Sequence, residues 1–259
     1  MNTKQLLLAI ATIGVILTSC VDNSPTKTTT TGGTTAFNTY LNPNITYGSV
    51  TDIDGNKYAT VTIGTQTWMA ENLRVTHYRN GDAISNVTDN NTWQKLTNGA
   101  QCTYENTNTQ DTITKYGRLY NFYTVSDIRS LAPLGWHVAT DVDWTTLRIF
   151  LNKNYGSDLN TAKALASTKG WYLSSRTDDV GNNPSINNST GFSAFPAGSR
   201  SIDGNFSKSA NQCSWWKPSG IVGTYTGYFQ FMYSDDGLIG GYNGASYNKA
   251  GYSVRCVKD

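Results

Sequence analysis

Two histidines, His77 and His137, are the side chains of this sequence best suited to move a proton or hold a transition metal at neutral pH. They lie in separate segments, and two histidines are too few for a zinc site with three histidine ligands. Neither lies next to an evident nucleophile in the sequence. We expect His137 to be partly buried and hydrogen-bonded to the backbone, His77 to lie at the surface, and neither to bind a metal.

Carboxylates occur mostly as scattered single residues. Asp52, Asp54 and Asn56 have the spacing of the first ligands in a calcium-binding loop, but the later ligands and the bidentate Glu of such a loop are missing. Glu71 and Glu105 are the only glutamates, and their positions do not indicate the paired carboxylates of a glycosidase. We therefore expect no cofactor, no metal and no catalytic residue.

Thiol chemistry has little support either. Cys213 has no activating base nearby in the sequence, so nothing indicates a lowered pKa for its thiol. Cys256 alternates with Tyr252 and Val254, as a small buried side chain or a half-cystine does on one face of a strand. These patterns favour a protein that is not an enzyme.

Aromatic side chains, interspersed with Ser, Asn and Gly, are concentrated in residues 205–252. They are Phe206, Trp215, Trp216, Tyr225, Tyr228, Phe229, Phe231, Tyr233, Tyr242, Tyr247 and Tyr252. This composition is typical of ligand-binding surfaces, because Tyr and Trp give a large contact area with few rotatable bonds. The alternative is that many of these side chains fill the core.

Four of these residues are candidate ligand-binding residues: Trp216, Tyr228, Tyr242 and Tyr247. Tyr228 would point opposite to the odd-numbered aromatic residues of its strand. Tyr242 and Tyr247 lie among glycines and asparagines that predict an exposed loop. Trp216 is the weakest candidate, because either member of the Trp215-Trp216 pair could face the core.

Short strands and a few helices must position these residues. Alternation predicts a hairpin of strands at 50–53 and 58–63, around the turn Asp54-Gly55-Asn56. Thr140, followed by acidic residues and by apolar residues at helical spacing, predicts a helix that ends near residue 154. Other apolar clusters predict helices near 119–123 and 161–167 and strands at 192–195, 215–216, 225–233 and 252–257. The expected fold class is α+β, with short helices and irregular antiparallel sheets.

Composition excludes several functions. The chain has 259 residues, 38% of them hydrophobic and 15% charged, and 20 basic against 18 acidic residues give a formal charge of +2. That balance provides no cationic surface for a phosphate backbone, so nucleic acid is not an expected partner. Abundant Gly, Thr, Asn and Tyr favour strands and turns over long helices.

The first residues predict export. A polar start with Lys4 precedes an apolar stretch at 6–17, which is too short to remain as a membrane-spanning helix. The motif Leu17-Thr18-Ser19-Cys20 resembles the lipobox of bacterial lipoproteins, in which the cysteine is acylated and becomes the new N-terminus. Such an acyl group holds an otherwise soluble domain on a membrane.

These features divide the chain into three parts. We expect a lipoprotein signal peptide at 1–19, a lipid anchor on Cys20 followed by a flexible tether in 20–49, and one folded domain at 50–259. The expected location is the cell envelope, as an outer-membrane lipoprotein that faces either the periplasm or the cell surface.

Four ordered sequence blocks carry a family resemblance. They are residues 63–73 (IGTQTWMAENL), 116–123 (YGRLYNFY), 131–141 (LAPLGWHVATD) and 251–259 (GYSVRCVKD). In this order and spacing they resemble the Fibrobacter succinogenes major paralogous domain, a family found in lipoproteins of Bacteroidetes and related bacteria. The resemblance covers about residues 50–259 and implies a C-type-lectin-like fold, in the variant seen in formylglycine-generating enzymes.

The resemblance also bears on the cysteines. Formylglycine-generating enzymes use a pair of reactive cysteines near the end of the fold, but that pairing does not transfer to Cys213 and Cys256. All of Cys102, Cys213 and Cys256 lie in the region that the resemblance covers, and a disulfide between Cys102 and Cys256 is the first choice in an oxidising envelope, with Cys213 free. The close alternative leaves two or all three of these cysteines unpaired.

Sequence and resemblance together predict a lipid-anchored cell-envelope protein. Its non-catalytic, lectin-like domain is expected to bind an extracellular ligand, which is a glycan or another protein. The alternatives are a structural module of a surface assembly and, with less support, an enzyme on the formylglycine-generating-enzyme-like scaffold. The expected partners are the membrane, through the lipid anchor, and the extracellular ligand, with no role for nucleic acid.

Overall fold

The computed structural model describes residues 40–156, 161–207, 209–218, 227–243 and 248–259, all within one compact unit, Ala36–Asp259. The predicted signal peptide and Cys20 lie outside the described residues. The unit is a mixed α and β structure with antiparallel sheets and mostly short helices, in agreement with the predicted class.

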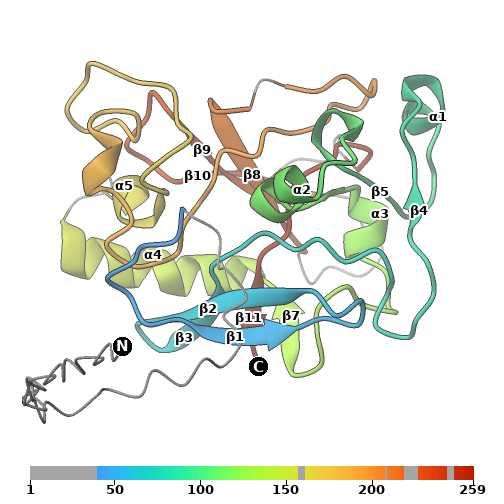
Figure 1. Ribbon diagram of the computed structural model, residues 1–259, viewed down its shortest axis with the longest axis horizontal. Coiled ribbons are helices and arrows are strands. Elements are labelled where there is room, and N and C mark those ends of the chain that lie inside the picture. Colours follow the sequence, from blue (N-terminus) through green and yellow to red (C-terminus); the bar gives the residue numbers. More distant parts are fainter. Residues whose placement is uncertain (1–39, 157–160, 208, 219–226, 244–247) are drawn as a thin grey trace, which may run out of the picture. The chain divides into compact units, whose positions relative to one another are not determined.

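A five-stranded antiparallel sheet contains both early and late parts of the chain (Figure 1). Its strands, in spatial order, are β1 (Gly48–Thr51), β2 (Lys57–Ile63), β3 (Gln66–Met69), β11 (Cys256–Lys258) and β7 (Trp136–Val138). The predicted hairpin is confirmed as β1 and β2, and Asp52 Oδ1 folds its turn by accepting hydrogen bonds from the backbone N–H groups of Asp54 and Asn56. Because β11 pairs with both β3 and β7, the final strand lies inside this sheet.

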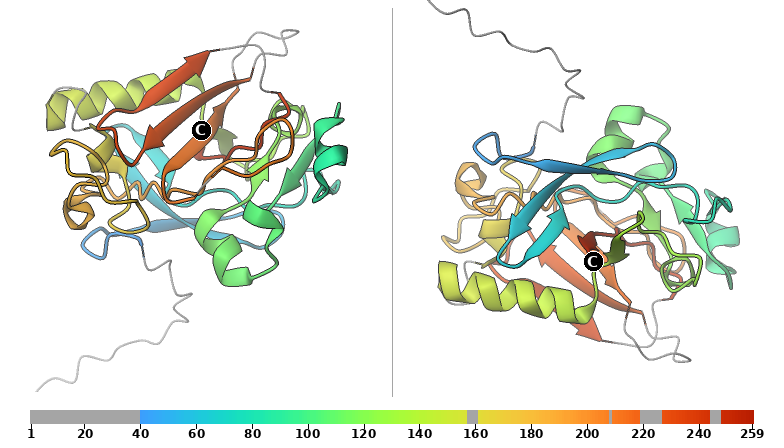
Figure 2. Two further views of the ribbon diagram at one scale, coloured as in Figure 1. Left: turned by 90° about the horizontal axis from the view of Figure 1, so that it is seen from above. Right: turned by 90° about the horizontal axis from the view of Figure 1, so that it is seen from below.

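Two smaller sheets complete the β structure. One has the antiparallel order β10 (Gly240–Asn243), β9 (Tyr228–Tyr233), β8 (Gln212–Lys217), and the other contains β4 (Ser85–Asn86), β5 (Ala100–Cys102) and β6 (Leu119–Tyr120). The helical segments are α1 (Asn90–Gln94), η1 (Tyr104–Asn106), α2 (Gln110–Tyr116), α3 (Phe122–Val125), α4 (Asp141–Tyr155), α5 (Thr161–Leu165) and η3 (Pro184–Ile186). Figure 2 shows α4 running along the β8–β10 sheet, against which it packs through Trp144 and Trp215.

The helix predicted after Thr140 is confirmed as α4. Thr140 and Asp143 form a capping box, in which Thr140 Oγ1 accepts a hydrogen bond from the Asp143 N–H group and Asp143 Oδ2 accepts one from the Thr140 N–H group. Trp144, Leu147 and Leu151 recur at helical spacing and are buried. The cap and this apolar stripe therefore fix where α4 begins and which face it turns to the core.

The folded unit begins earlier than predicted. Tyr40 and Leu41 are buried, and the Tyr40 ring lies 4.8 Å from the ring of Phe195. The Tyr40 hydroxyl donates a hydrogen bond to the Lys115 carbonyl at 2.9 Å. The prediction that the tether continues through residue 49 is therefore wrong for residues 40–49, because these residues pack on the domain and continue into β1.

A buried arginine joins distant parts of the core. The side chain of Arg255 is 1% exposed, and its Nε donates to Asn72 Oδ1 at 2.7 Å. Its Nη1 donates to the carbonyls of Met69 and Phe192 at 2.8 Å each, and its Nη2 donates to the Ser193 carbonyl at 3.1 Å. Burial lowers the pKa of Arg255 to about 10, so the group stays charged at neutral pH.

The side-chain amide of Asn72 bonds on both of its ends. Its Oδ1 accepts hydrogen bonds from Arg255 Nε and from Trp215 Nε1, the latter at 2.9 Å. Its Nδ2 donates to the Tyr116 carbonyl at 2.9 Å and to Ser253 Oγ at 3.3 Å. The first and last of the four sequence blocks therefore meet in the core.

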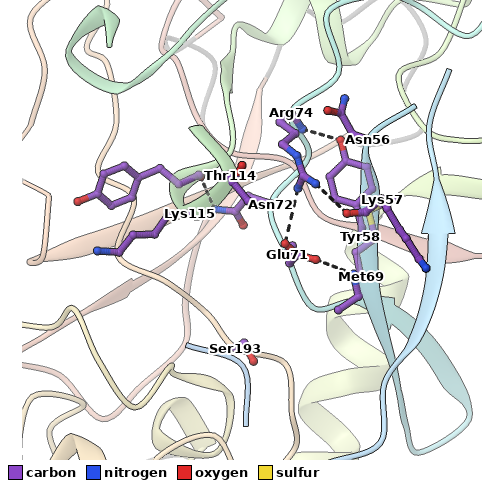
Figure 3. A network of polar contacts seen from close by, with 12 residues as sticks. Asn56, Lys57, Tyr58, Met69, Glu71, Asn72, Arg74, Thr114, Lys115 and Ser193 are labelled. Carbon is purple, nitrogen blue, oxygen red and sulfur yellow. Dashed lines mark hydrogen bonds and ion pairs between the residues drawn. The ribbon is translucent and has the colours of Figure 1, made fainter. Parts of the chain in front are cut away.

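An ion pair lies beside this network (Figure 3). Glu71 is 3% exposed and lies 3.6 Å from Arg74, and its Oε2 accepts a hydrogen bond from the Ala59 N–H group at 2.6 Å. Arg74 Nη2 donates to the Lys57 carbonyl at 2.7 Å, while the guanidinium lies 4.3 Å from the centre of the Tyr58 ring. The pair thus holds the segment after β3 against β2.

Replacing Asn72 with Ala is expected to lower the free energy of unfolding by about 3 kcal/mol or more. The change leaves buried donors on Arg255 and Trp215 without an acceptor, at about 1–3 kcal/mol for each such group. Asn152→Ala, on the exposed side of α4, is the control and is expected to change stability by about 0.5 kcal/mol or less. Urea unfolding followed by tryptophan fluorescence measures both, and equal midpoints would contradict the role given to Asn72.

His137 links the start of α4 to the last residue of the chain. Its Nδ1 lies 2.7 Å from Asp259 Oδ1, and its Nε2 lies 3.0 Å from Asp143 Oδ2. The expectation that backbone groups satisfy His137 is therefore wrong, because two carboxylates do so. Burial by itself lowers the pKa of His137, but the hydrogen bonds to Asp259 and Asp143 outweigh it and leave the pKa raised.

This arrangement predicts a dependence of stability on pH. Because the pKa of His137 is higher in the folded protein, its charge stabilises the fold below a pH of about 6.5, and this contribution is lost as the pH rises through the folded pKa. His137→Gln is expected to destabilise the protein more at about pH 5.5 than at about pH 8.5. The difference should stay below about 1 kcal/mol, since the side chain is 38% exposed. Urea unfolding at both pH values checks this, and an equal loss at both would contradict it.

Candidate functional site

The predicted disulfide between Cys102 and Cys256 is wrong, because the structure describes Cys102, Cys213 and Cys256 as free and buried. Cys102 packs in a cluster with Trp93 and Leu119, whereas Cys256 belongs to a different core cluster. Burial raises the pKa of Cys102 to about 11 and also raises the pKa of the other two thiols. These groups are therefore protonated at neutral pH, and none is an activated nucleophile.

The acidic turn between β1 and β2 uses its carboxylates to hold itself together. Asp52 Oδ2 accepts hydrogen bonds from Asn56 Nδ2 at 2.9 Å and from the Tyr58 hydroxyl at 2.6 Å. Asp54 Oδ1 lies 2.6 Å from Nδ1 of His77, which is 43% exposed and thus at the surface as expected. Within the described residues, no three His, Cys, Asp or Glu side chains gather closely enough to hold a metal ion.

Trp216 is not an exposed residue, and its selection as a ligand-binding residue is wrong. It is completely buried, and its Nε1 donates a hydrogen bond to the Tyr120 carbonyl at 2.6 Å. The ring centres of Phe122 and Tyr252 lie 5.3 Å and 4.6 Å from the centre of the Trp216 ring. These neighbours cover it, because the segments around residues 120–122 and 252 pack across that end of β8.

The tyrosine candidates have different outcomes. Tyr228 pairs with Lys217 on the face of the β8–β10 sheet that turns toward α4, and it is partly exposed there. Tyr242 lies on the opposite face and is 45% exposed. Tyr247 lies outside the described residues. The described members of this selection therefore do not form one surface, and Tyr242 is the most exposed of them.

Tyr242 lies at one end of a row of partly exposed aromatic rings. We call it the outer aromatic face, and it consists of Phe229, Phe231 and Tyr233 of β9 and Tyr242 of β10. Ring centres lie 5.5 Å apart for Tyr242 and Phe229, 5.9 Å for Phe229 and Phe231, and 5.2 Å for Phe231 and Tyr233. The rings thus form a continuous contact surface across two strands.

Gly240 makes room for this row. It pairs with Phe231, and a Cβ atom at Gly240 would lie 2.2 Å from the Phe231 ring. The missing side chain therefore lets the ring lie directly on β10. On the buried side, the Phe229 ring contacts those of Trp216 at 6.4 Å and Tyr252 at 4.6 Å, so the row rests on packed aromatic groups.

Alternation along β9 correctly placed the odd-numbered residues on one face but could not show which face was outer. Strand pairing shows which face is inner, because it brings Met232 opposite Cys213 and Gln230 opposite Trp215. All four of these side chains are buried, so their face is the inner one. No pattern within β9 alone distinguishes this arrangement from its reverse, because both faces carry aromatic residues.

Comparison with known proteins adds the family. Neither a search of the curated proteins nor one of the solved structures gave a match. The family model described as Fibrobacter succinogenes major domain matches residues 61–258. The matched span begins in β2 and ends in β11, so it includes both Asn72 and Arg255 and the whole outer aromatic face. The chain therefore belongs to the Fibrobacter succinogenes major domain family, the one that its four sequence blocks resemble.

Proposed function

We propose that this protein is a lipid-anchored cell-envelope protein whose C-type-lectin-like domain binds an extracellular ligand without catalysis. The ligand is a glycan or another protein, and the outer aromatic face is the contact surface. The observation that carries the proposal is this row of partly exposed rings, in which Tyr242, at one end, is 45% exposed.

A glycan suits this face. Aromatic rings stack on the apolar faces of sugar rings, while Tyr hydroxyl groups offer hydrogen bonds to sugar hydroxyls. Neighbouring rings already restrain Phe229 and Phe231, so little side-chain freedom is lost when a ligand binds. Clustered exposed aromatic groups of this kind mark interaction surfaces more often than single exposed residues do.

The non-catalytic part of the proposal rests on the chemistry of the described residues. The thiols of Cys102, Cys213 and Cys256 are buried with raised pKa values. Asp52 and Asp54 are occupied by hydrogen bonds within their turn. The lectin-like fold is supported by the family resemblance and by the return of the late strand β11 to the sheet that β1 opens.

A structural module of a surface assembly is the second candidate. Strand β10 stands at the end of its sheet in the part of the chain that the structure describes. An edge strand can pair with a strand of another chain and so build an oligomer. Self-association measured by sedimentation velocity, together with no binding to glycans, would favour this function over ligand binding.

Tyr242→Ala and Phe231→Ala are expected to weaken glycan binding by about tenfold to thirtyfold, since truncating an aromatic anchor costs about 2 kcal/mol of binding. The matched control is Tyr172→Ala, because Tyr172 is 52% exposed and lies outside the outer aromatic face. A glycan array of the full chain identifies the strongest ligand, and titration calorimetry then compares the variants. Equal affinities for wild type, Tyr242→Ala and Phe231→Ala would contradict the assigned surface.

The anchor is proposed from the lipobox-like motif that ends at Cys20, which lies outside the described residues. In the described part of the chain, no helix has the length and apolar character needed to cross a membrane. On the basis of the motif, the proposed attachment is acylation of Cys20 after removal of residues 1–19.

Mass spectrometry of the protein from bacterial membranes is expected to find Cys20 as the acylated N-terminal residue. Cys20→Ser should abolish the lipid mass and move the protein out of the membrane fraction, because the anchoring thiol is gone. A chain that retains residues before position 20, or an unmodified Cys20 thiol, would be inconsistent with the proposed anchor.

A further inference from the structure

A small cavity lies on the opposite side of the β8–β10 sheet from the outer aromatic face. It has a volume of about 190 Å³ and lies between α4 and the inner face of the sheet. Its lining includes Asp141, Trp144 and Arg148 of α4 together with Lys217, Gln230 and Gly241 of the three strands. This volume is below the roughly 300–1,000 Å³ of pockets for drug-sized ligands, so it suits a small molecule.

Positive charge predominates in the lining. Lys217 is 4% exposed, and its Nζ lies 2.6 Å from Asp141 Oδ1. Asp141 itself is 57% exposed, so an incoming anion can compete with its carboxylate for the ammonium. Arg148 adds a second cation to the lining, and the exposed arginine lies on the solvent side. Two cations against one carboxylate favour a negatively charged occupant.

Trp144, which lines the cavity, carries an indole N–H group that lacks an acceptor. Trp144 is 4% exposed, and its buried Nε1 has no hydrogen-bond partner among the described residues. Indole nitrogen only donates, so an acceptor atom is the one kind of group that can satisfy it. A buried donor without a partner costs about 1–3 kcal/mol, so a shift of the atoms that cover this nitrogen is favourable if it brings an acceptor to it.

Gly241 forms the wall of the cavity on the β10 side. A Cβ atom there would lie 3.1 Å from Gln230 Oε1 and 3.6 Å from Lys217 Nζ. The absent side chain thus leaves space beside the ammonium of Lys217, under the edge strand β10. Any larger residue at position 241 would project toward Lys217 and reduce the space.

We propose that this cavity binds a small ligand through its carboxylate. One carboxylate oxygen accepts a hydrogen bond from Lys217 in competition with Asp141. The rest of the ligand lies against Trp144, where a small shift of the covering atoms lets it place an acceptor at Nε1. The carboxylate belongs either to a free organic acid or to an acidic sugar, and both share this chemistry. The site is separate from the outer aromatic face, so it stands whether or not that face binds a glycan.

The test uses the full chain and three probes: sodium lactate as a free acid, sodium glucuronate as an acidic sugar, and glucose as the neutral match of glucuronate. Sodium chloride at the same concentration controls for ionic strength. Two-dimensional NMR of the indole N–H groups follows Trp144, whose signal is identified by its loss in Trp144→Phe. At least one acid is expected to shift this signal in a saturable manner, while glucose and sodium chloride leave it unchanged.

Binding by both acids assigns the site to the carboxylate alone, and binding by glucuronate alone assigns it to an acidic sugar. Lys217→Met is expected to weaken the affinity at least tenfold. Gly241→Val is expected to do the same by filling the space, and it alters no charge, so it tests the site even if Lys217→Met fails to fold. Tyr242→Ala, on the outer aromatic face, should bind the acid like wild type.

The proposal is overturned if neither acid shifts the Trp144 signal at tens of millimolar concentration. It is also overturned if folded Lys217→Met or Gly241→Val binds the acid with wild-type affinity. Because Tyr242→Ala affects the outer aromatic face and not the cavity, failure of the glycan proposal and failure of the cavity proposal give different results.

Discussion

The hydrogen bonding of one buried guanidinium is the constraint on which the rest of the domain depends. An ionised group in the core costs several kcal/mol unless acceptors surround it, and Arg255 obtains them from Asn72 and Met69 on one side and from residues 192–193 on the other. These segments are far apart in the sequence, so they must come together for the charge to be accommodated. Trp215 of β8 also donates to Asn72, which ties the sheet that displays the outer aromatic face to the same network.

The parts of the fold that were predictable are those encoded locally. Thr140 and Asp143 form a cap within four residues, and the hairpin turn at Asp52 closes on itself, so both could be recognised from neighbouring residues. The burial of Tyr40 could not, because it depends on a ring contact with Phe195, far along the chain. The same holds for the contact between His137 and Asp259, because these residues meet only through the pairing of β11 with β7.

The strands that carry the proposed contact surface could be recognised from the sequence, but the directions of their side chains could not. Residues 205–252, in which aromatic residues are concentrated, include β8, β9 and β10, and Tyr242 was among the residues selected there. Trp216 was selected wrongly because its burial is produced by Phe122 and Tyr252, which reach it from other elements. The inner face of the same sheet holds Lys217 and Gln230, polar residues that a simple apolar-inside rule would have turned outward. The apolar-inside rule fails for both faces of this sheet, because the inner face borders a polar cavity and the outer face carries aromatic rings.

The position of β11 determines when the domain can fold. Residues 256–258 lie between β3 and β7, and Arg255 precedes them directly. The five-stranded sheet and the core network are therefore both incomplete until this segment has packed. Pairings between such distant residues also slow folding, because loop closure must come before the contacts that reward it. Because the five-stranded sheet and the core network share this one segment, neither is stable without the other, which makes the folding of the domain cooperative.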